Sequence, residues 1–338
     1  MSAEPERPAS VGVVIATRNR RDTLIATLDR LAGLDERPPV VVVDNNSSDG
    51  TPEAVAEHHP GVRVLRLDRN AGSAARNEGA RLIDTEHVAF CDDDSWWAPQ
   101  ALTTAARVFA AHPRLGLLAG RIVVEPSGRL DPTSEVMRRS VITSLESNAG
   151  PSVLGFVACG AIVRRVPFLE VGGFHPRLMI GGEEDLLALD LAAAGWELAY
   201  VHEVVAHHQP AESGERSGRA ALELRNGLWT TWLRRRARGA LRRTATLVAA
   251  GVRERRVRAL AGALRGLPWV VRERRPVPPA VERAARAIEV ERRRRALPVA
   301  TPLSRVSDGH GHQSDRSSKA SRRRGLSGHE GRDSRDRV

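Results

Sequence analysis

Residues 92–94 are three consecutive aspartates that directly follow an apolar run, residues 87–91. Like charges this close raise one another's pKa unless a cation lies among them, so the run either faces open water or holds a metal ion. Trp96 and Trp97 come next, and indole faces are suited to covering sugars and bases. The stretch is therefore the first candidate for one wall of a ligand site.

A second acidic cluster, Glu183, Glu184 and Asp185, stands where the sequence predicts the start of a helix. The helix dipole stabilises carboxylates at this position, so a capping role is the simpler alternative. Three acids in succession exceed what capping requires. The cluster is therefore the second candidate for chemistry.

Two histidines, His207 and His208, end a later predicted strand. Adjacent side chains on a strand point to opposite faces, so at most one of the pair faces a common site with the acids. A single histidine at such a place is more often structural than a metal ligand. The sequence alone leaves the choice between the two open.

The elements that must position these residues begin with two apolar runs, residues 11–16 and 39–43. Each run predicts a buried strand and is followed by an amphipathic helix, which indicates a parallel sheet covered on both faces. In such sheets ligands bind outside the carboxyl ends of the strands, where Thr17, Asp44 and Asp92 all emerge. Three polar loops are therefore expected to converge.

A glycine-containing loop, residues 70–79, follows a third predicted strand, residues 62–66, and leads into a helix of small residues. Arg76 and the free N–H groups at the helix start are suited to meet a phosphate or to hold neighbouring loops. The alternative is close helix packing with Arg76 in a structural ion pair. The sequence gives the two nearly equal support.

Phosphate-binding glycine signatures are missing from the sequence. No GxGxxG follows the first predicted strand and no GxxxxGK[ST] occurs anywhere. The charge of a diphosphate would have to be neutralised by other means. A cation held by residues 92–94 would do this, because hard carboxylate oxygens bind Mg²⁺ or Mn²⁺ and the metal can bridge two phosphate oxygens.

Charge divides this chain of 338 residues into two halves. Residues 1–210 carry a net charge of −8, and residues 211–338 carry +19. Arginine-rich segments with leucine and tryptophan, from residue 225 to about 296, predict basic amphipathic helices. These suit an anionic membrane surface, with an ordinary solvated helical cap as the alternative. Residues 301–338 have too few large apolar side chains for a core and are expected to be disordered.

Targeting and redox signals point to the cytoplasm. The first ten residues are polar and proline-rich, and no window reaches the roughly eighteen uncharged apolar residues that a membrane span needs. The two cysteines form neither a disulfide framework nor a zinc-binding pattern. We expect a protein that is cytoplasmic, either free or peripheral at the inner face of the cell membrane.

Taken in order, these motifs resemble those of family 2 glycosyltransferases, the large inverting group with the GT-A fold. The resemblance runs from residue 11 to about 230. Seven elements in one order, on the predicted strand ends, make it specific. They are residues 13–20, 41–51, 70–79, 90–94 (the DxD element), 172–174, 184–185 and 195–196.

The resemblance implies a role for each candidate residue. Asp185 would be the general base, with Glu184 supporting it or the acceptor. Asp94 would be the more direct metal ligand, and Asp92 would lie nearer the ribose, although Asp93 makes this division uncertain. The metal site would comprise Asp92, Asp94 and His207. The nucleotide-sugar site would comprise Thr17, Arg18, Asn19, Asp44, Asn70, Gly72, Arg76, Asp92 and Asp93.

The fold implied is α/β: a GT-A domain with a Rossmann-like, mostly parallel central sheet and helices on both faces over residues 1–210. A basic helical extension over 211–300 and a disordered tail over 301–338 would follow. The expected reaction is metal-dependent transfer of a sugar, with Mg²⁺ or Mn²⁺, from a UDP-, GDP- or dTDP-sugar to an acceptor hydroxyl. The acceptor would be a glycan, a lipid-linked glycan or a small molecule. The reaction would belong to cell-envelope glycan or glycoconjugate synthesis.

Two other classes of function compete with this interpretation. A nucleotidyltransferase acting on sugar phosphates would share the nucleotide, the metal and the acids, but the loop after the first strand lacks the expected phosphate-binding signature. A basic nucleic-acid-binding protein is suggested by the second half of the chain. No recognition module accompanies those arginines, and the acidic first half would repel phosphate chains, so we expect no nucleic-acid partner.

Overall fold

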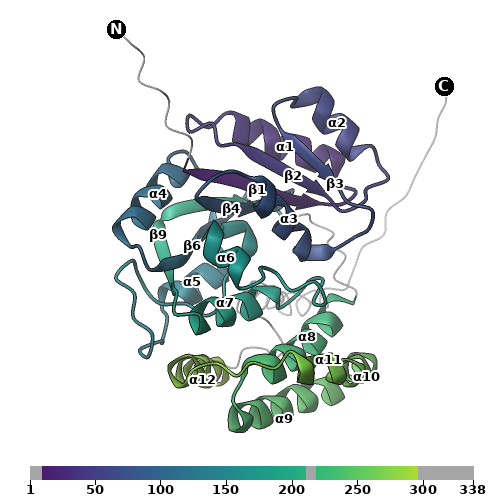
Figure 1. Ribbon diagram of the computed structural model, residues 1–338, viewed down its shortest axis with the longest axis vertical. Coiled ribbons are helices and arrows are strands. Elements are labelled where there is room, and N and C mark those ends of the chain that lie inside the picture. Colours follow the sequence, from purple (N-terminus) through teal and green to yellow (C-terminus); the bar gives the residue numbers. More distant parts are fainter. Residues whose placement is uncertain (1–9, 211–217, 296–338) are drawn as a thin grey trace, which may run out of the picture. The chain divides into compact units, whose positions relative to one another are not determined.

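A computed structural model describes residues 10–210 and 218–295 of the chain (Figure 1). Its centre is a nine-stranded sheet in the order β3-β2-β1-β4-β8-β6-β9-β5, with β7 paired to β6. The strands are β1 (Val11–Thr17), β2 (Val40–Asp44), β3 (Arg63–Arg66), β4 (His87–Cys91), β5 (Ser95–Trp97), β6 (Leu115–Val124), β7 (Arg129–Leu130), β8 (Ala161–Arg164) and β9 (Glu197–His208).

Helices flank the sheet and continue beyond it (Figure 1). Those of the first part are α1 (Arg21–Ala32), α2 (Thr51–His58), α3 (Ala75–Leu82), α4 (Ala101–Ala111), α5 (Pro132–Arg138), α6 (Arg165–Glu170) and α7 (Glu183–Ala193). Those of the later part are α8 (Arg219–Arg234), α9 (Ala237–Arg253), α10 (Val257–Arg265), α11 (Leu267–Arg272) and α12 (Pro279–Arg294).

The half of the sheet that holds β1 to β4 is parallel. Its register sets Thr17 opposite Asp44, while Ile15 pairs with Cys91, the residue before the aspartates. The predicted convergence of these strand ends is therefore confirmed. The other half is mixed, because β8 runs antiparallel to both β4 and β6 and β5 runs antiparallel to β9.

Two apolar cores, one on each face, explain why the strands are valine runs rather than alternating patterns. One core includes Leu28 of α1 and Phe109 of α4. The other includes Phe168 of α6 and Leu187 of α7. Helices therefore cover both faces, as predicted.

Residues 125–150, in which the sequence shows little pattern, contain β7 and the short helix α5. Asp131 caps α5, since its side chain accepts a hydrogen bond from the backbone N–H of Thr133 at 2.7 Å. The apolar run over residues 156–163 is a strand only in its last part. Its first part is a 3₁₀ turn, Ala158–Gly160, and β8 begins only at Ala161.

Helix α8 joins the later helices to the first part of the chain, because it packs against α7 as well as α9, α10 and α11. The side-chain amide of Asn226, fully buried in α8, donates to the carbonyls of Leu178 and Gly181 at 2.8 and 2.7 Å. Arg234 also forms an ion pair with Asp190 of α7. These contacts hold the loop that leads into the second acidic cluster.

No helix in residues 10–210 or 218–295 is long and apolar enough to cross a membrane. The predicted boundary near residue 210 is adjacent to residues 211–217, which lie outside the described part of the chain. The predicted disordered tail, residues 301–338, also lies outside it.

Asn77 holds the loop before α7 to α3, and its loss has a predictable cost. Its side chain accepts from the backbone N–H of Phe174 at 2.9 Å and donates to the carbonyl of Phe174 at 2.8 Å. Asn77→Ala leaves both buried groups without a partner and should lower the free energy of unfolding by about 2–4 kcal/mol in a denaturant titration. Glu78→Ala, on the exposed side of α3, is the control and should cost about 0.5 kcal/mol or less. Equal losses of unfolding free energy in the two variants would contradict this role of Asn77.

Candidate functional site

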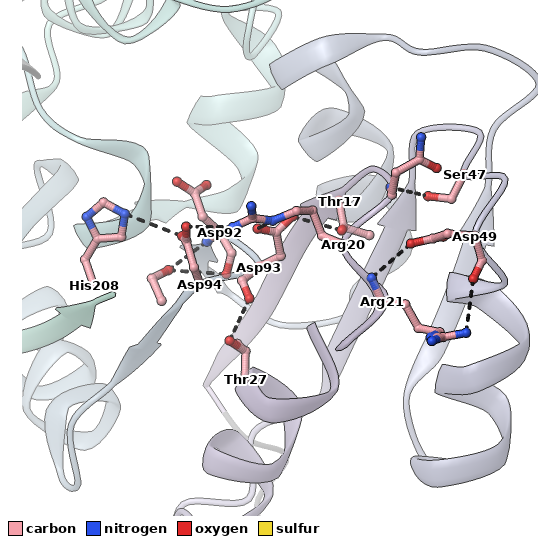
Figure 2. A network of polar contacts seen from close by, with 12 residues as sticks. Thr17, Arg20, Arg21, Thr27, Ser47, Asp49, Asp92, Asp93, Asp94 and His208 are labelled. Atoms are coloured by element: carbon pink, nitrogen blue, oxygen red, sulfur yellow. Dashed lines mark hydrogen bonds and ion pairs between the residues drawn. The ribbon is translucent and has the colours of Figure 1, made fainter. Parts of the chain in front are cut away.

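The middle aspartate of the triplet is tied to the loop after β1 (Figure 2). The hydroxyl of Thr17 donates to Asp93 at 2.9 Å, and that of Thr27 donates to the Asp93 carbonyl at 2.7 Å. Arg20 then spans two acids, with Nε 3.3 Å from Asp93 and Nη2 3.2 Å from Asp94. Asp93 therefore braces the triplet against β1 and α1.

This bracing has an electrostatic cost. Burial, followed by the charge of Asp94, raises the pKa of Asp93 to about 6, although Arg20 and Thr17 act in the opposite direction. The side chains of Asp93 and Asp94 are 16% and 15% exposed, whereas that of Asp92 is 35% exposed. Asp92 is thus the carboxylate most open to an incoming group.

Arg76 connects the two acidic clusters. It is buried in the first turn of α3, donates to the carboxylate of Asp92 and lies 5.9 Å from the centre of the Phe174 ring. Burial lowers the pKa of Arg76, but the charges of Asp92, Glu183 and Glu184 outweigh it and leave the pKa raised. Arg76 therefore forms an ion pair with Asp92, as the structural alternative predicted, and its contact with a phosphate stays a prediction.

Glu183 and Glu184 are both buried at the start of α7. Burial raises the pKa of each, and the charge of Glu184 raises that of Glu183 well above its ordinary value. A side-chain hydrogen bond from Glu183 favours the ionised form of Glu184, as do the charges of Arg219 and Arg76. Two buried carboxylates side by side disfavour double ionisation, so the pair favours binding a proton.

Asp185 lies on a different side of the same helix. It lines a cavity of about 90 Å³ between α7, α8, α9 and α12. Its charge acts on Arg243 and Arg292, which line that cavity too. The role of Asp185 as the base, with Glu184 supporting it, stays a prediction. Glu183 and Glu184 lie near enough to Arg76 for their charges to act on it, whereas Asp185 lines the cavity.

The two histidines differ in their contacts. Strand pairing sets Ser95 opposite His208 and Trp96 opposite His207. His208 Nε2 lies 3.4 Å from Asp94 Oδ1, whereas His207 Nδ1 lies 2.9 Å from Glu125 Oε1. Alternation along β9 thus turns His207 away from the aspartates, and His208 is the histidine beside them. Burial lowers the pKa of His208, but Asp94 and the other nearby carboxylates raise it by more.

The two tryptophans do not form the expected ligand wall. Trp97 is fully buried in the core. Trp96 stacks on His207, with ring centres 5.3 Å apart, and the Arg30 guanidinium lies 3.6 Å above its ring. Both indoles serve packing, since β5 is an edge strand held to β9.

Asp44 ends β2 with a fully buried side chain. Its Oδ2 accepts from the backbone N–H of Ser47 at 2.9 Å, and Arg66 Nε lies 3.9 Å from the same oxygen. In the described part of the chain, Oδ1 has no hydrogen-bond partner. A buried carboxylate oxygen without a donor is unusual and suits a ligand that supplies one.

Several other residues predicted to line the nucleotide-sugar site hold loops in place. Asn70 accepts from the N–H of Gly72 at 2.9 Å, and Gly72, at φ +61°, lies so close to the Met179 backbone that a Cβ would overlap it. Asn19 accepts from the backbone N–H of Ser48 at 2.8 Å. Arg18 is exposed. These residues shape the site, and Gly72 does so by close approach.

Three residues of this region were missed or left undecided by the sequence: Arg20, Glu183 and His208. Arg20 stands three positions after Thr17 in the same polar loop, which is the signal that could have found it. Glu183 was recognised only as part of an acidic run. His208 could not be separated from its neighbour without the register of β9.

The donor set fits a divalent cation. Asp92 and Asp94 supply hard carboxylate oxygens at the strand end, as Mg²⁺ and Mn²⁺ prefer. Among the described residues no three His, Cys, Asp or Glu side chains are arranged to hold a metal ion by themselves. Mg²⁺ at nucleotide sites commonly takes one or two carboxylates and completes its shell with phosphate oxygens and water.

Comparison with known proteins decides the family. Residues 12–172 match the family model described as "Glycosyl transferase family 2". This stretch of the chain thus matches glycosyl transferase family 2. The chain is therefore a glycosyltransferase, and its sheet and helices form a GT-A fold.

Curated relatives of this glycosyltransferase come from Mycobacterium tuberculosis. An N-acetylglucosaminyl-diphospho-decaprenol L-rhamnosyltransferase is 26% identical over 296 residues, covering 73% of this chain and 96% of the relative. A pre-mycofactocin glycosyltransferase is 30% identical over 210 residues, covering 59% of this chain and 43% of the relative.

Solved structures support the same fold. A mannosyltransferase from Pyrobaculum calidifontis, in complex with GDP-Man and Mn²⁺, aligns with a TM-score of 0.53 at 22% identity, covering 86% of this chain and 82% of its own. Residues 1–349 of S. aureus TarS, in complex with UDP-GlcNAc, align with a TM-score of 0.51 at 19% identity, covering 65% and 66%. At these identities the likeness concerns the fold.

The raised pKa of Asp93 predicts a pH-dependent effect on stability. The folded protein binds this proton more tightly than the unfolded chain, so ionisation of Asp93 destabilises the fold as the pH rises through about 6. Without divalent cations, the stability of Asp93→Asn relative to the parent should therefore increase by about 1–3 kcal/mol between pH 4 and pH 8.

Asp49→Asn is the control of opposite sign. Burial raises the pKa of Asp49, but hydrogen bonds from Thr51 and the Arg21 backbone leave it lowered. The relative stability of this variant should decrease as the pH rises through the range below about 4 and should stay nearly constant between pH 4 and pH 8. The same trend in both variants, measured by urea unfolding, would contradict the account of Asp93.

Proposed function

We propose that this glycosyltransferase is metal-dependent and inverting, and that it moves a sugar from a nucleotide-sugar donor to a hydroxyl of a lipid-linked glycan. One observation carries the proposal. Arg76 donates to Asp92, just after β4, and lies near enough to the buried pair Glu183 and Glu184, at the start of α7, for their charges to raise its pKa. This proximity supports a donor-binding carboxylate and a base in one site.

Asp44 is proposed to bind the nucleoside. Its buried Oδ1 is suited to accept a hydrogen bond from the base or the ribose, and its other oxygen is already fixed by Ser47. Thr17 lies at the neighbouring strand end and keeps Asp93 in place beneath the donor. The loop residues Asn70 and Gly72 shape this pocket through the backbone.

Asp94 and Asp92 are proposed to hold Mg²⁺ or Mn²⁺, with His208 next to Asp94. When bound, such a cation neutralises the charge that develops on the leaving diphosphate. Arg20 fixes the orientation of Asp94 by its second contact to Asp93. Arg76 keeps Asp92 directed to the centre of the site.

Glu184 is proposed to be the general base. It accepts the proton of the acceptor hydroxyl as that oxygen bonds to the anomeric carbon, while the bond from this carbon to the nucleoside diphosphate breaks on the opposite face. Attack from that face inverts the configuration. Burial raises the pKa of Glu184, which brings a carboxylate base closer to neutral pH, while the charges of Arg219 and Arg76 and a side-chain hydrogen bond with Glu183 favour its ionised form.

The acceptor class rests on the relatives. The one that matches along 96% of its own length is a rhamnosyltransferase whose name specifies an N-acetylglucosaminyl-diphospho-decaprenol acceptor. A lipid-linked glycan of the cell envelope is therefore the proposed acceptor. The proposed location of the enzyme is the inner face of the cell membrane. The donor is proposed to be a UDP-, GDP- or dTDP-sugar.

Glu184→Gln tests the base most directly. The amide cannot take the proton, so the transfer rate should fall by about 10²–10⁴-fold while donor binding stays within about twofold. Asp185→Asn is the matched control on the same helix and should lose less than about tenfold, because the proposal gives Asp185 no part in the proton transfer. Sugar transfer is measured by release of nucleoside diphosphate with acceptor present. A larger loss of transfer rate in Asp185→Asn than in Glu184→Gln would instead identify Asp185 as the base.

The two histidines give a second matched pair. His208→Ala removes the side chain beside Asp94, so the affinity for Mn²⁺ with nucleoside diphosphate should fall by about 10–100-fold. His207→Ala should leave this affinity unchanged within about twofold, because His207 contacts Glu125 and Trp96 instead. Titration calorimetry with UDP, GDP and dTDP measures both and identifies the preferred base. Loss in His207→Ala alone would overturn the assignment.

A further inference from the structure

Helices α9, α10 and α11 have an inner face that packs on α8. Leu247 of α9, Ala263 of α10 and Val270 of α11 join Leu228 and Trp229 of α8 in one buried cluster. The indole N–H of Trp229 donates to the carbonyl of Ala263 at 3.0 Å. The inward side chains of these three helices are thus fully accounted for by the fold.

Their outward side chains are also large and apolar, which a solvated cap does not require. On α9, Leu241, Val248 and Val252 follow one another at spacings of seven and four, which places them on one stripe. Val257 and Leu264 on α10 repeat the spacing of seven. The most exposed of this set, with 61–69% of their surface accessible, are Leu241, Val252, Val257, Leu264 and Val271.

Arginines accompany each of these five side chains. Arg242, Arg253, Arg258, Arg265 and Arg272 each follow one of them in the sequence, and all five are exposed. Between residues 237 and 272 the sequence contains only one acidic residue, Glu254, which is ion-paired with Arg256 at 2.7 Å. We define the docking face as these five arginines and the five apolar side chains before them.

The positive charge and the exposed apolar side chains of the docking face together restrict the class of partner that fits it. An acidic protein or a nucleic acid would match the arginines but would leave the aliphatic side chains in water. A bilayer with anionic headgroups satisfies both, because the aliphatic groups enter the interface while the guanidinium groups stay among the phosphates. A purely neutral bilayer would leave the positive charge without a partner.

We propose that α9, α10 and α11 dock this enzyme onto the surface of an anionic phospholipid bilayer through the docking face. The site of sugar transfer is linked to it by α8, which packs on all three helices and on α7. Docking does not depend on the proposed reaction. It is measured without donor, metal or acceptor.

Co-sedimentation of the full chain with vesicles provides the test. Binding is expected to vesicles of phosphatidylcholine with phosphatidylglycerol, and to be much weaker to phosphatidylcholine alone. The triple variant Val257→Asp, Leu264→Asp and Val271→Asp should lower the partition constant by at least about tenfold. The control Val166→Asp alters a valine of α6 that is 57% exposed and should change nothing.

A milder variant keeps the test valid should the triple variant fold poorly. Arg258→Gln with Arg265→Gln leaves the apolar packing untouched and should weaken binding about fivefold for each charge removed. Both variants keep residues 296–338 unchanged, so a loss is due to the docking face. The proposal would be overturned if the intact chain failed to bind vesicles or bound both kinds of vesicle equally. It would also be overturned if both variants bound as well as the intact chain. Tighter binding of duplex DNA than of vesicles at physiological salt would overturn it too.

Discussion

Repulsion among carboxylates at the carboxyl ends of the strands is the constraint on which this structure depends. Asp44, Asp92, Asp93 and Asp94 gather there because the register of the parallel strands brings those ends together. Three groups offset the repulsion locally: Arg20, Arg76 and His208. The offset is incomplete at Asp93, whose pKa is raised to about 6. A bound cation would reduce the repulsion that remains among these carboxylates.

The same cations organise the chain beyond the sheet. Arg76 draws the start of α7 to the first cluster, and Asn77, its neighbour, fixes the loop around Phe174 that precedes α7. Asn226 then binds the carbonyls just before α7 from the other side. Contacts from both parts of the chain therefore position the buried acids Glu183 and Glu184.

Much of the fold was predictable because strand ends in parallel sheets carry their own signal. Apolar runs followed by polar loops identified β1, β2 and β4, and with them Thr17, Asp44 and the aspartates. The roles of single residues within a run were not predictable. Whether His207 or His208 meets Asp94 depends on the phase of β9, and whether Glu184 or Asp185 lies beside Arg76 depends on the rotation of α7. Tertiary packing sets both.

Anomalous diffraction from crystals grown with Mn²⁺ and a nucleoside diphosphate measures the central claim most directly. The account predicts one manganese peak within bonding distance of Asp94 or Asp92, on the diphosphate side, with Asp93 still bound to Thr17 and Arg20. A peak coordinated by Asp93, or by Glu183 and Glu184, would contradict it. So would a bound nucleoside diphosphate that contacts no part of the strand ends.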